Sequence, residues 1–511
     1  MEDLLAQVNL LVNINCKLCV NSAVAIITAA LNLTNMILQR LPYILFRSYP
    51  TYGYITDNRN YGYDTASHSC LKVGELLLSK TGSVFYSKLK DIPQNINDVL
   101  CQLYKLYPEV PASIIQKDAL EFYKDLHSRG FIYLGEENDY SNTIQQYFSY
   151  NNVHSFELKI SQHQYAQTTY EETFGQICYL TRVHVDISSR CNENCVHCYI
   201  PSRYKCGTMS EDLFDDILQQ CRTMNVLNLT ISGGEPMLNP FLKDFLLKCS
   251  QSNFSVNLLS NLTLLSDGLL DVISSSPLIC VQTSLYAMDE GIHDSITRNQ
   301  GSFRKTMDGI KRLHERNVPL QINCPIMKQN KNSYRSVLHF AKSLNIEADA
   351  DYSLFGSFDN SRSNLSCRLS FGEIKDIVKE TYLDKSSIGA KASKKTNSND
   401  PICSVCKHSL CISNTGYIYP CEGWQSLKIG DLKEHTLKEI WEEGALVLHL
   451  RNLKYKNFPK CNACLYKKYC SICLIMNANE DPNGNYRNTN TLMCEISKVK
   501  ANGQKTNRQC E

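Results

Sequence analysis

Between residues 179 and about 356, short apolar runs alternate regularly with amphipathic segments. Six of the apolar runs have the length and β-branched content of buried strands: residues 183–187, 227–232, 255–260, 279–285, 320–327 and 348–354. Helical runs with one apolar face separate them, including residues 212–225, 241–251, 303–317 and 333–344. Such alternation predicts parallel strands joined by right-handed crossovers. Six units predict an α/β fold whose sheet is an open partial barrel rather than a closed barrel of eight.

The N-terminal part of the chain follows another pattern. Strand-like residues 43–46 and 52–55 precede three expected helices, at residues 71–79, 96–107 and 112–129, and a closing strand at residues 131–135. Short strands, three helices and a closing strand predict a small winged-helix-like module. A DNA-binding or a purely structural winged helix has the same order of elements.

With 511 residues the chain is long enough for several domains, each with its own core. We divide it into seven segments: a helical segment of unknown role (1–40), the winged-helix-like module (41–137), a connector (138–178), the partial barrel (179–356), a linker (357–400), a cysteine-rich domain (401–496) and a polar tail (497–511).

The charge is balanced, with 53 Lys and Arg against 51 Asp and Glu. A nucleic-acid partner is therefore not expected, because such proteins usually carry a clustered basic excess. The uncharged window from residue 19 to residue 38 is long enough to span a bilayer, but it contains several Asn, Ser and Thr residues. This window favours a partly buried helix, and we expect no membrane partner.

Twenty-four cysteines are an unusually large number. In a small secreted domain they would indicate disulfides, but this chain is long and its first residues, MEDLLAQ, do not resemble a signal peptide. The sequence therefore predicts reduced, metal-binding cysteines in the cytoplasm.

The first motif is CNENCVHC, which follows the first barrel strand directly. Cys191, Cys195 and Cys198 offer three thiolates on one loop. Thiolates are the usual ligands of iron–sulfur clusters, and three of them leave one iron free to bind another molecule. This spacing predicts a [4Fe–4S] cluster with an open iron.

The second motif is Ser232-Gly233-Gly234-Glu235-Pro236, at the end of the second barrel strand. Glycine permits a close approach of backbone to a ligand, although a glycine pair is also common in plain turns. Together the two motifs resemble the signature of the radical SAM superfamily. The resemblance implies that Gly233, Gly234, Glu235 and Pro236 meet the amino group of S-adenosylmethionine (SAM).

The resemblance assigns further positions. It implies that His197 lies near the adenine, that Ser260 and Asn261 contact the ribose, and that Ser284 and Arg298 bind the methionine carboxylate. Each of these residues lies after a strand, as catalytic groups of barrel enzymes do. One position departs from the family pattern, since Leu262 stands where glycine is usual.

The C-terminal cysteines resemble the SPASM domain, which holds two auxiliary [4Fe–4S] clusters. The resemblance implies that auxiliary cluster I takes Cys403, Cys421, Cys473 and either Cys406 or Cys411. It implies that auxiliary cluster II takes Cys461, Cys464, Cys470 and Cys494. Cys470 and Cys473 are separated by two residues where the family commonly has three, which makes Cys473 the least secure ligand. Structural zinc is the alternative, because four cysteines can also bind zinc.

The order of elements in residues 41–137 resembles the leader-peptide recognition element of peptide-modifying enzymes, which binds a leader as an added strand. Over nearly its whole length the chain thus resembles radical SAM/SPASM peptide maturases. The resemblance implies a 5′-deoxyadenosyl radical, a low-potential donor of the flavodoxin or ferredoxin type, and a crosslink, with a thioether as first choice, in a ribosomally made peptide. Carbon–carbon crosslinking, side-chain oxidation of the sulfatase-maturase type, and a non-catalytic iron–sulfur or zinc scaffold are the alternatives. Asp351 is a candidate proton acceptor.

Overall fold

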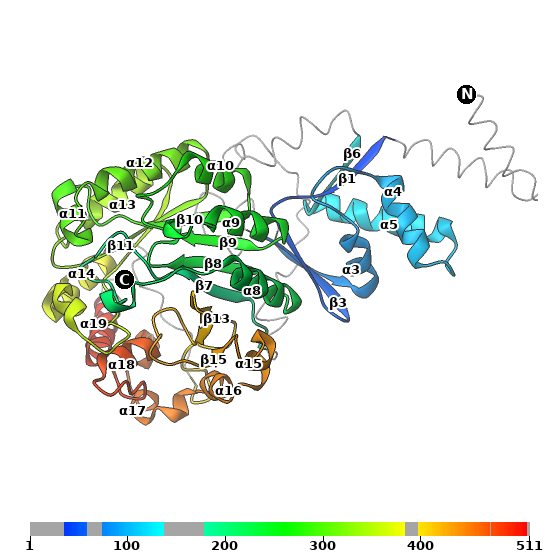
Figure 1. Ribbon diagram of the computed structural model, residues 1–511. Coiled ribbons are helices and arrows are strands. Elements are labelled where there is room, and N and C mark those ends of the chain that lie inside the picture. The colour runs from blue at the N-terminus through cyan, green and yellow to red at the C-terminus, as the bar shows by residue number, and fades with distance from the viewer. Residues whose placement is uncertain (1–34, 59–73, 137–177, 384–396, 471, 508–511) are drawn as a thin grey trace, which may run out of the picture. The chain divides into compact units, whose positions relative to one another are not determined.

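The computed structural model describes residues 35–58, 74–136, 178–383, 397–470 and 472–507 (Figure 1). The chain forms two compact units. The described residues of the smaller unit lie within 35–44, 48–55 and 76–136, and nearly all of the larger unit follows residue 177.

The smaller unit contains three helices and an antiparallel sheet. The helices are α3 (Lys80–Ser87), α4 (Ile96–Leu106) and α5 (Ala112–Ser128). The sheet has the order β5-β1-β6, with β5 at Gln94–Asn95, β1 at Met36–Arg40 and β6 at Ile132–Glu136. A second sheet has the order β2-β3-β4, with β2 at Ile44–Ser48, β3 at Tyr52–Asp57 and β4 at Glu75–Ser79.

Two N-terminal predictions were wrong where the structure describes them. Residues 75–79, expected to be helical, form β4, because the side chain of Ser79 accepts a hydrogen bond from the Gly82 amide and so begins helix α3 only at Lys80. Residues 36–40, expected to belong to a helical segment, form β1 at the centre of its sheet. Residues 1–34 and the connector at 138–177 lie outside the described residues.

The larger unit confirms the predicted partial barrel. Its six parallel strands have the order β12-β11-β10-β9-β8-β7. The strands are β7 (Arg182–Ser188), β8 (Asn228–Gly233), β9 (Ser255–Leu259), β10 (Ile279–Ser284), β11 (Leu320–Pro325) and β12 (Glu347–Asp351). The helices between them are α8 (Glu211–Thr223), α9 (Leu242–Gln251), α10 (Asp267–Ser275), α11 (Glu290–Thr297), α12 (Ser302–Glu315) and α13 (Tyr334–Ser343). Figure 1 shows these helices on the outer side of the sheet.

The cysteine-rich region continues the same sheet, which the sequence did not predict. Strand β13 (Ser409–Ile412) pairs in parallel with β7, and β14 (Tyr417–Tyr419) and β15 (Gly430–Asp431) follow as antiparallel neighbours. Strands this short carry little periodicity, and only pairing with a preformed edge defines them. The region and the barrel are therefore one structural body.

Helices complete the C-terminal part of the described chain. They are α14 (Phe371–Leu383), α15 (Leu437–Glu443), α16 (Ala445–Arg451), α17 (Pro459–Asn462), α18 (Leu474–Glu480) and α19 (Thr491–Asn507). Helix α19 runs well into the predicted polar tail. Single-turn 3₁₀ helices lie at Ser202–Tyr204, Pro236–Leu238, Ser363–Cys367, Tyr455–Asn457 and Lys467–Tyr469.

The first barrel strand separates core from cavity. Val183, Val185 and Ile187 are fully buried in the hydrophobic core, and the alternate residues His184 and Asp186 point to the other face of the sheet. Because strand β7 is apolar on one face and polar on the other, it presents polar side chains to the barrel interior.

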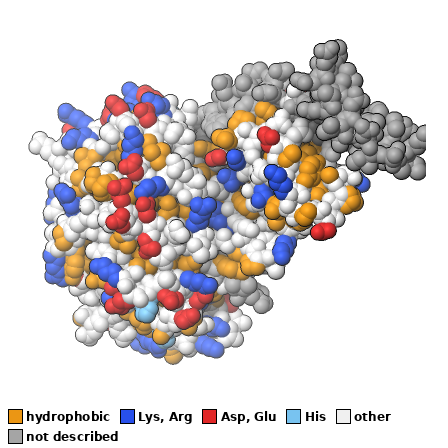
Figure 2. Space-filling model, turned by 45° about the vertical axis from the view of Figure 1, so that its right-hand side comes forward, with side chains coloured by type: hydrophobic (Ala, Val, Ile, Leu, Met, Phe, Trp, Pro, Cys, Tyr) orange, Lys and Arg blue, Asp and Glu red, His pale blue; other side chains and the backbone are white. Residues whose placement is uncertain are grey.

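Among the described residues, no helix combines the length and the apolar character that crossing a membrane requires. On the face drawn in Figure 2, acidic and basic side chains of the larger unit are interspersed.

Candidate active site

One cavity of about 690 Å³ lies in the larger unit, at the carboxyl ends of the barrel strands. Its walls include ten of the residues that the sequence singled out: Cys191, Cys195, His197, Cys198, Gly233, Gly234, Ser260, Asn261, Ser284 and Asp351. Cys421 and Glu422, which follow β14, line the same cavity. The structure therefore brings Cys421, one of the C-terminal cysteines, to the same cavity as the three cysteines of the first motif, which are far from it in sequence.

The loop that carries Cys191, Cys195 and Cys198 is fixed to helix α11. The amides of Asn194 and Val196 donate to the last two carbonyls of that helix, at 3.1 and 2.9 Å. The three thiols are partly buried. Burial is the largest cause of a raised pKa for the Cys195 thiol, and nearby carboxylate and thiol groups add to it. The loop thus gathers three thiols whose ionised, metal-binding form a cationic iron centre would stabilise.

Side chains tie this loop to the turn after β9. The Asn261 amide nitrogen donates to the Asn192 side-chain oxygen at 2.9 Å, and the Asn192 amide donates to the Thr263 hydroxyl at 2.7 Å. The sequence had not singled out Asn192, and its only signal was its place between two expected ligands. Asn261 thereby helps to position the cysteine loop as well as lining the cavity.

The two glycines of the second motif lie against the backbone of β7 and its loop. Gly233 has φ +129°, and a Cβ added there would lie 2.0 Å from the Ser188 carbonyl oxygen. A Cβ added at Gly234 would lie 2.3 Å from the Arg190 carbonyl oxygen. The Gly234 amide donates to Ser188 at 2.7 Å. Glycine is therefore required at both positions, because the backbone of β8 contacts the start of the cysteine loop.

Glu235 is buried and joins three segments. Its carboxylate accepts from the Ser260 hydroxyl at 2.7 Å and from the amides of Asn261 and Met237 at 2.8 and 3.0 Å. Burial raises the pKa of Glu235, and these hydrogen bonds oppose the shift. Glu235 and Pro236 do not line the cavity. The carboxylate fixes the turn against β9, which leaves the backbone of the motif to face the cavity.

The departure at Leu262 is accommodated by a second glycine. Leu262 has φ +62°, a backbone conformation that favours glycine, and its side chain is buried. A Cβ added at Gly309 on helix α12 would lie 2.7 Å from the Leu262 Cβ. Gly309 therefore makes room for a leucine where a glycine was expected.

His197 lies inside the cavity wall beside Tyr286. The two rings are in edge contact, with centroids 5.2 Å apart, and the Tyr286 hydroxyl is 3.5 Å from His197 Nε2. Burial, and then the charge of Lys205, lower the pKa of His197 to about 4, so the ring is neutral. Tyr286 had not been singled out, although it follows Ser284 by two residues at the end of β10.

Arg298 is exposed at the end of helix α11, with φ +53°, and it does not line the cavity. Ser284 does line it. Asp351 lies at the exposed end of β12, where its carboxylate accepts from the Ser353 amide at 2.9 Å.

The C-terminal cysteines form two groups in the structure. In one, Cys470, Cys494 and Cys464 lie close enough for their charges to raise the pKa of Cys461, to about 11, although burial is the larger cause. In the other, Cys473 lies close to Cys403 and to Cys421. Apart from Cys406 and Cys411, this is the division that the sequence predicts.

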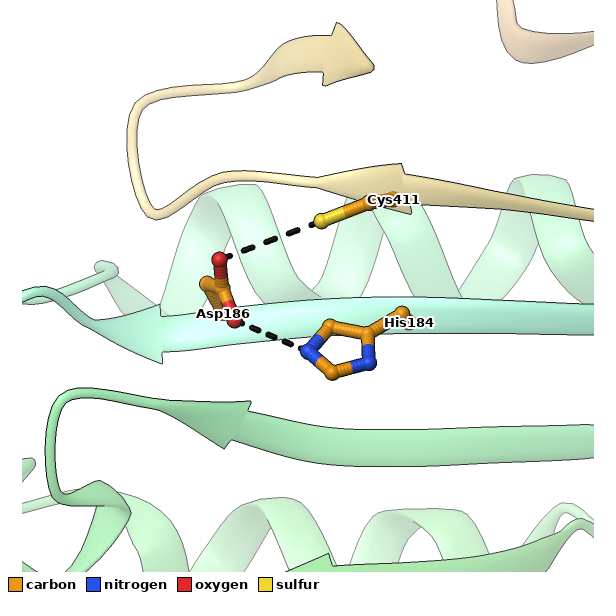
Figure 3. Close-up of side chains that lie close together, drawn as sticks. All are labelled: His184, Asp186 and Cys411. Carbon is orange, nitrogen blue, oxygen red and sulfur yellow. Dashed lines mark hydrogen bonds and ion pairs between the residues drawn. The ribbon is translucent and has the colours of Figure 1, made fainter. Parts of the chain in front are cut away.

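Cys406 and Cys411 differ in their surroundings. Cys406, at φ +54°, lies near Cys403, and Arg451 donates to its carbonyl at 2.8 Å. Burial raises the pKa of the Cys406 thiol to about 12, and the positive charge of Arg451 opposes the shift. Cys411 is fully buried on β13, where its thiol lies 3.8 Å from the Asp186 carboxylate (Figure 3). Burial, and then Asp186, raise its pKa well above the ordinary value.

These surroundings fit the cofactors that the sequence implies. The cysteine loop offers three thiols at the cavity, and Gly233 and Gly234 line the same cavity beside them. Four cysteines outside the expected ligand sets are buried, as expected for cysteines that are not ligands: Cys221, Cys249, Cys280 and Cys324. The thiol of Cys280 donates to the Asn257 side-chain oxygen at 3.4 Å, and that of Cys324 donates to the Tyr286 carbonyl at 3.7 Å.

Comparison with known proteins gives two family matches. The model described as the radical SAM superfamily matches residues 185–341, and the model described as an iron–sulfur cluster-binding domain, SPASM, matches residues 403–465. The first match includes the cysteine loop, the glycine pair and Ser284, and the second includes Cys421. Asp351 lies outside both matches.

Two curated relatives are similar over more than half of the chain. An AdoMet-dependent heme synthase of Methanosarcina barkeri is 24% identical over 316 residues, which cover 56% of this chain and 89% of the relative. The antilisterial bacteriocin subtilosin biosynthesis protein AlbA of Bacillus subtilis is 23% identical over 308 residues, which cover 58% and 67%. Among solved structures, Streptococcus suis SuiB bound to precursor peptide SuiA has the same fold, with a TM-score of 0.56, 16% identity, and coverage of 89% of this chain and 99% of SuiB.

Proposed function

Because the chain belongs to the radical SAM superfamily and carries an iron–sulfur cluster-binding SPASM domain, we propose that it is an enzyme that modifies a ribosomally made precursor peptide. The observation that carries the proposal is a cavity lined by the three cysteines of the first motif and by Cys421 of the C-terminal set. Its volume of about 690 Å³ leaves room for a peptide side chain beside a bound cofactor.

The radical SAM domain binds a [4Fe–4S] cluster and SAM, and we assign the cluster to Cys191, Cys195 and Cys198. This centre supplies a 5′-deoxyadenosyl radical when reduced. The protein's own part is to hold SAM against the backbone of Gly233 and Gly234 and to exclude water around the radical.

We assign the fourth position of auxiliary cluster I to Cys406. A ligand must be a thiolate, and the guanidinium of Arg451 beside Cys406 favours that form. Cys411 instead faces the carboxylates of Asp186 and Glu422, which favour the thiol. With Cys403, Cys406, Cys421 and Cys473 as ligands, the group bound there is fully coordinated. A cluster held there by four thiolates would have no open iron for a substrate thiol, and it would supply only a site that accepts an electron.

This assignment predicts different iron contents for two matched variants. Replacing Cys406 with Ser should lower the iron of the reconstituted protein by up to about four atoms per chain, because the auxiliary cluster loses one of its four protein ligands. Replacing Cys411 with Ser should leave the iron content unchanged. Iron analysis and electron paramagnetic resonance of the reduced proteins measure both. If only the Cys411→Ser protein lost iron, the fourth ligand would be Cys411 instead.

We assign substrate recognition to the smaller unit, the predicted winged-helix-like module of residues 41–137. Strand β6 pairs with β1 on one side, and among the described strands it has no neighbour on the other. A leader peptide can add there as a further strand, bound by main-chain hydrogen bonds. The fold shared with SuiB, which was solved with its precursor peptide, supports this assignment.

We propose a thioether as the bond that forms, because a leader-binding module and two auxiliary clusters favour crosslinking. A carbon–carbon crosslink and side-chain oxidation use the same cavity, and the names of the relatives include enzymes on other substrates.

A low-potential donor of the flavodoxin or ferredoxin type would supply the electron. Reduced cysteines support a cytoplasmic location, since no disulfide joins those that the structure describes.

The proposal is tested with the anaerobically reconstituted protein, SAM, dithionite and a short peptide encoded beside its gene. We expect 5′-deoxyadenosine and a peptide that has lost two hydrogen atoms for each bond formed. A thioether also consumes one thiol, which iodoacetamide labelling of the product detects. Absence of 5′-deoxyadenosine with the cognate peptide would instead favour a peptide-binding iron–sulfur or zinc scaffold.

A further inference from the structure

Strand β7 carries two polar side chains on the face toward the barrel interior. Figure 3 shows the Asp186 carboxylate between His184 on the same strand and Cys411 on β13. His184 Nε2 lies 3.0 Å from one carboxylate oxygen, and the Gln425 amide donates to the other at 2.6 Å. The exposed fractions of the His184 and Asp186 side chains are only 13% and 10%. The pair is therefore a packed, hydrogen-bonded unit rather than a chance surface contact.

The contact with Asp186 determines which ring nitrogen of His184 is free. An ionised carboxylate only accepts hydrogen bonds, so Nε2 carries the proton and Nδ1 of the neutral ring has a lone pair. In Figure 3, Nδ1 lies on the side of the ring away from Asp186. Within the part of the chain that the structure describes, Nδ1 has no hydrogen-bond partner, and His184 lines the cavity. The free lone pair of His184 Nδ1 is thus available at the cavity wall.

We propose that His184 is the catalytic base that accepts the proton released when the new bond forms, with Asp186 as its positioning residue. The inference rests on the proposed function. A carbon–hydrogen bond of the peptide loses its hydrogen atom to the 5′-deoxyadenosyl radical. A second group, X–H, then bonds to that carbon through X, its proton goes to His184 Nδ1, and the remaining electron goes to the auxiliary iron–sulfur cluster. The atoms and electrons balance in the same way whether X is sulfur, carbon or oxygen.

Four other acids line the cavity: Glu193, Asp349, Asp351 and Glu422. Glu193 accepts from the thiol of Cys195, an expected cluster ligand, at 3.4 Å, and Asp349 lies on the same strand as Asp351. One oxygen of the Glu422 carboxylate accepts from the thiol of Cys421, a proposed cluster ligand, at 2.9 Å. Asp351 lies at the exposed end of β12 and accepts from a backbone amide. An imidazole has an ordinary pKa near neutrality, which suits a base at physiological pH better than a carboxylate does. His184 is therefore preferred over Asp351, the candidate taken from the sequence.

The groups that face His184 determine its proton affinity. Burial lowers the pKa of His184, but the Asp186 carboxylate and, more weakly, Glu422 outweigh burial and raise it overall. The thiol of Cys411 on β13 lies close to the pair, and Arg182, two residues back on β7, lines the same cavity. The hydroxyls of Tyr199 and Tyr419 lie near enough to Asp186 to interact with its charge. A raised pKa makes His184 a stronger proton acceptor once it is neutral.

Replacing His184 with Gln tests the proposal, because it separates radical formation from bond formation. We expect 5′-deoxyadenosine to persist within about threefold of the wild type and the crosslinked product to fall by about 10²- to 10⁴-fold, the usual share of a general base. The matched control is His339→Gln, an exposed histidine on helix α13, which should change neither. Equal product from His184→Gln and wild type would overturn the proposal. Loss of 5′-deoxyadenosine with full iron content would also overturn it, by placing His184 in radical formation. Failure of the wild type to form 5′-deoxyadenosine would count against the proposed function instead.

A second pair of variants guards against a purely structural effect. In His184→Ala, added imidazole should restore product, which it would not do if the side chain only packed the sheet. In Asp186→Asn the pKa of His184 should fall, because the neighbouring charge is gone. The rise of product formation with pH should therefore move to lower pH, and the maximum rate should drop. An unmoved profile would contradict the role of Asp186. A divalent metal found beyond the cluster iron, and lost in His184→Gln, would reassign His184, Asp186 and Cys411 as a metal site.

Discussion

Replacing Cys195 with Ala should abolish SAM cleavage and remove one whole cluster from the protein. The loop of Cys191, Cys195 and Cys198 holds its three thiols at the cavity wall, and two thiolates cannot retain a cluster that already has one open iron. Iron in the reconstituted protein should fall from about twelve to about eight atoms per chain. Iron analysis and 5′-deoxyadenosine formation under reducing conditions measure the two effects.

Cys206→Ala is the matched control for this variant. Cys206 is an exposed cysteine shortly after the loop, and it lies outside both sets of expected ligands. Its replacement should leave iron content and 5′-deoxyadenosine unchanged. If Cys195→Ala kept full iron and full SAM cleavage, the three-thiolate assignment would be wrong.

Replacing Gly234 with Ala should have the second largest effect. The added methyl group would lie 2.3 Å from the Arg190 carbonyl oxygen and 2.8 Å from that of Ser189, and both are backbone atoms that cannot rotate away. Either the turn after β8 or the cysteine loop must move. Displacement of a reacting group by about 1 Å can cost 10²-fold in rate, so SAM cleavage should fall by at least about 10²-fold. Initial rates of 5′-deoxyadenosine formation at saturating SAM measure the effect.

The same substitution at Gly372 is the control, because a Cβ there meets nothing within 4 Å. Gly372→Ala, in the first turn of helix α14, should keep full activity and should stabilise the helix by up to about 1 kcal/mol. Thermal unfolding of both variants separates a local displacement from global loss of structure. Full activity in Gly234→Ala would show that the close approach of the two backbones is not needed.

Cys195→Ala and Gly234→Ala both change segments that meet where strands β7 and β8 end. The Glu235 amide donates to Arg190 at 2.8 Å, and the Glu235 carboxylate then accepts from Ser260 and Asn261 at the end of β9. Three successive strand ends are thus joined by one buried residue. We expect the cysteine loop and the SAM-binding turn to respond together to any change in this region.

The sequence alone determined the barrel and the spacing of the candidate metal donors. Apolar runs of strand length between amphipathic helices are repeated six times, and each of the six strands was observed. Helices α4 and α5 were predicted within two residues at each end. These features are local, since periodicity, capping and thiol spacing are properties of neighbouring residues.

The tertiary structure alone decided what depends on segments that are distant in sequence. Strands β13, β14 and β15 are too short to identify until they pair beside β7. The surroundings of Cys406 and Cys411 differ through residues far from them in sequence, among them Arg451 beside Cys406 and Asp186 beside Cys411. His184 resembled any polar residue on a strand until the fold placed Asp186 on one side of its ring and the cavity on the other. Burial, charge and hydrogen-bond partners act through space, and a linear pattern does not record which distant residues supply them.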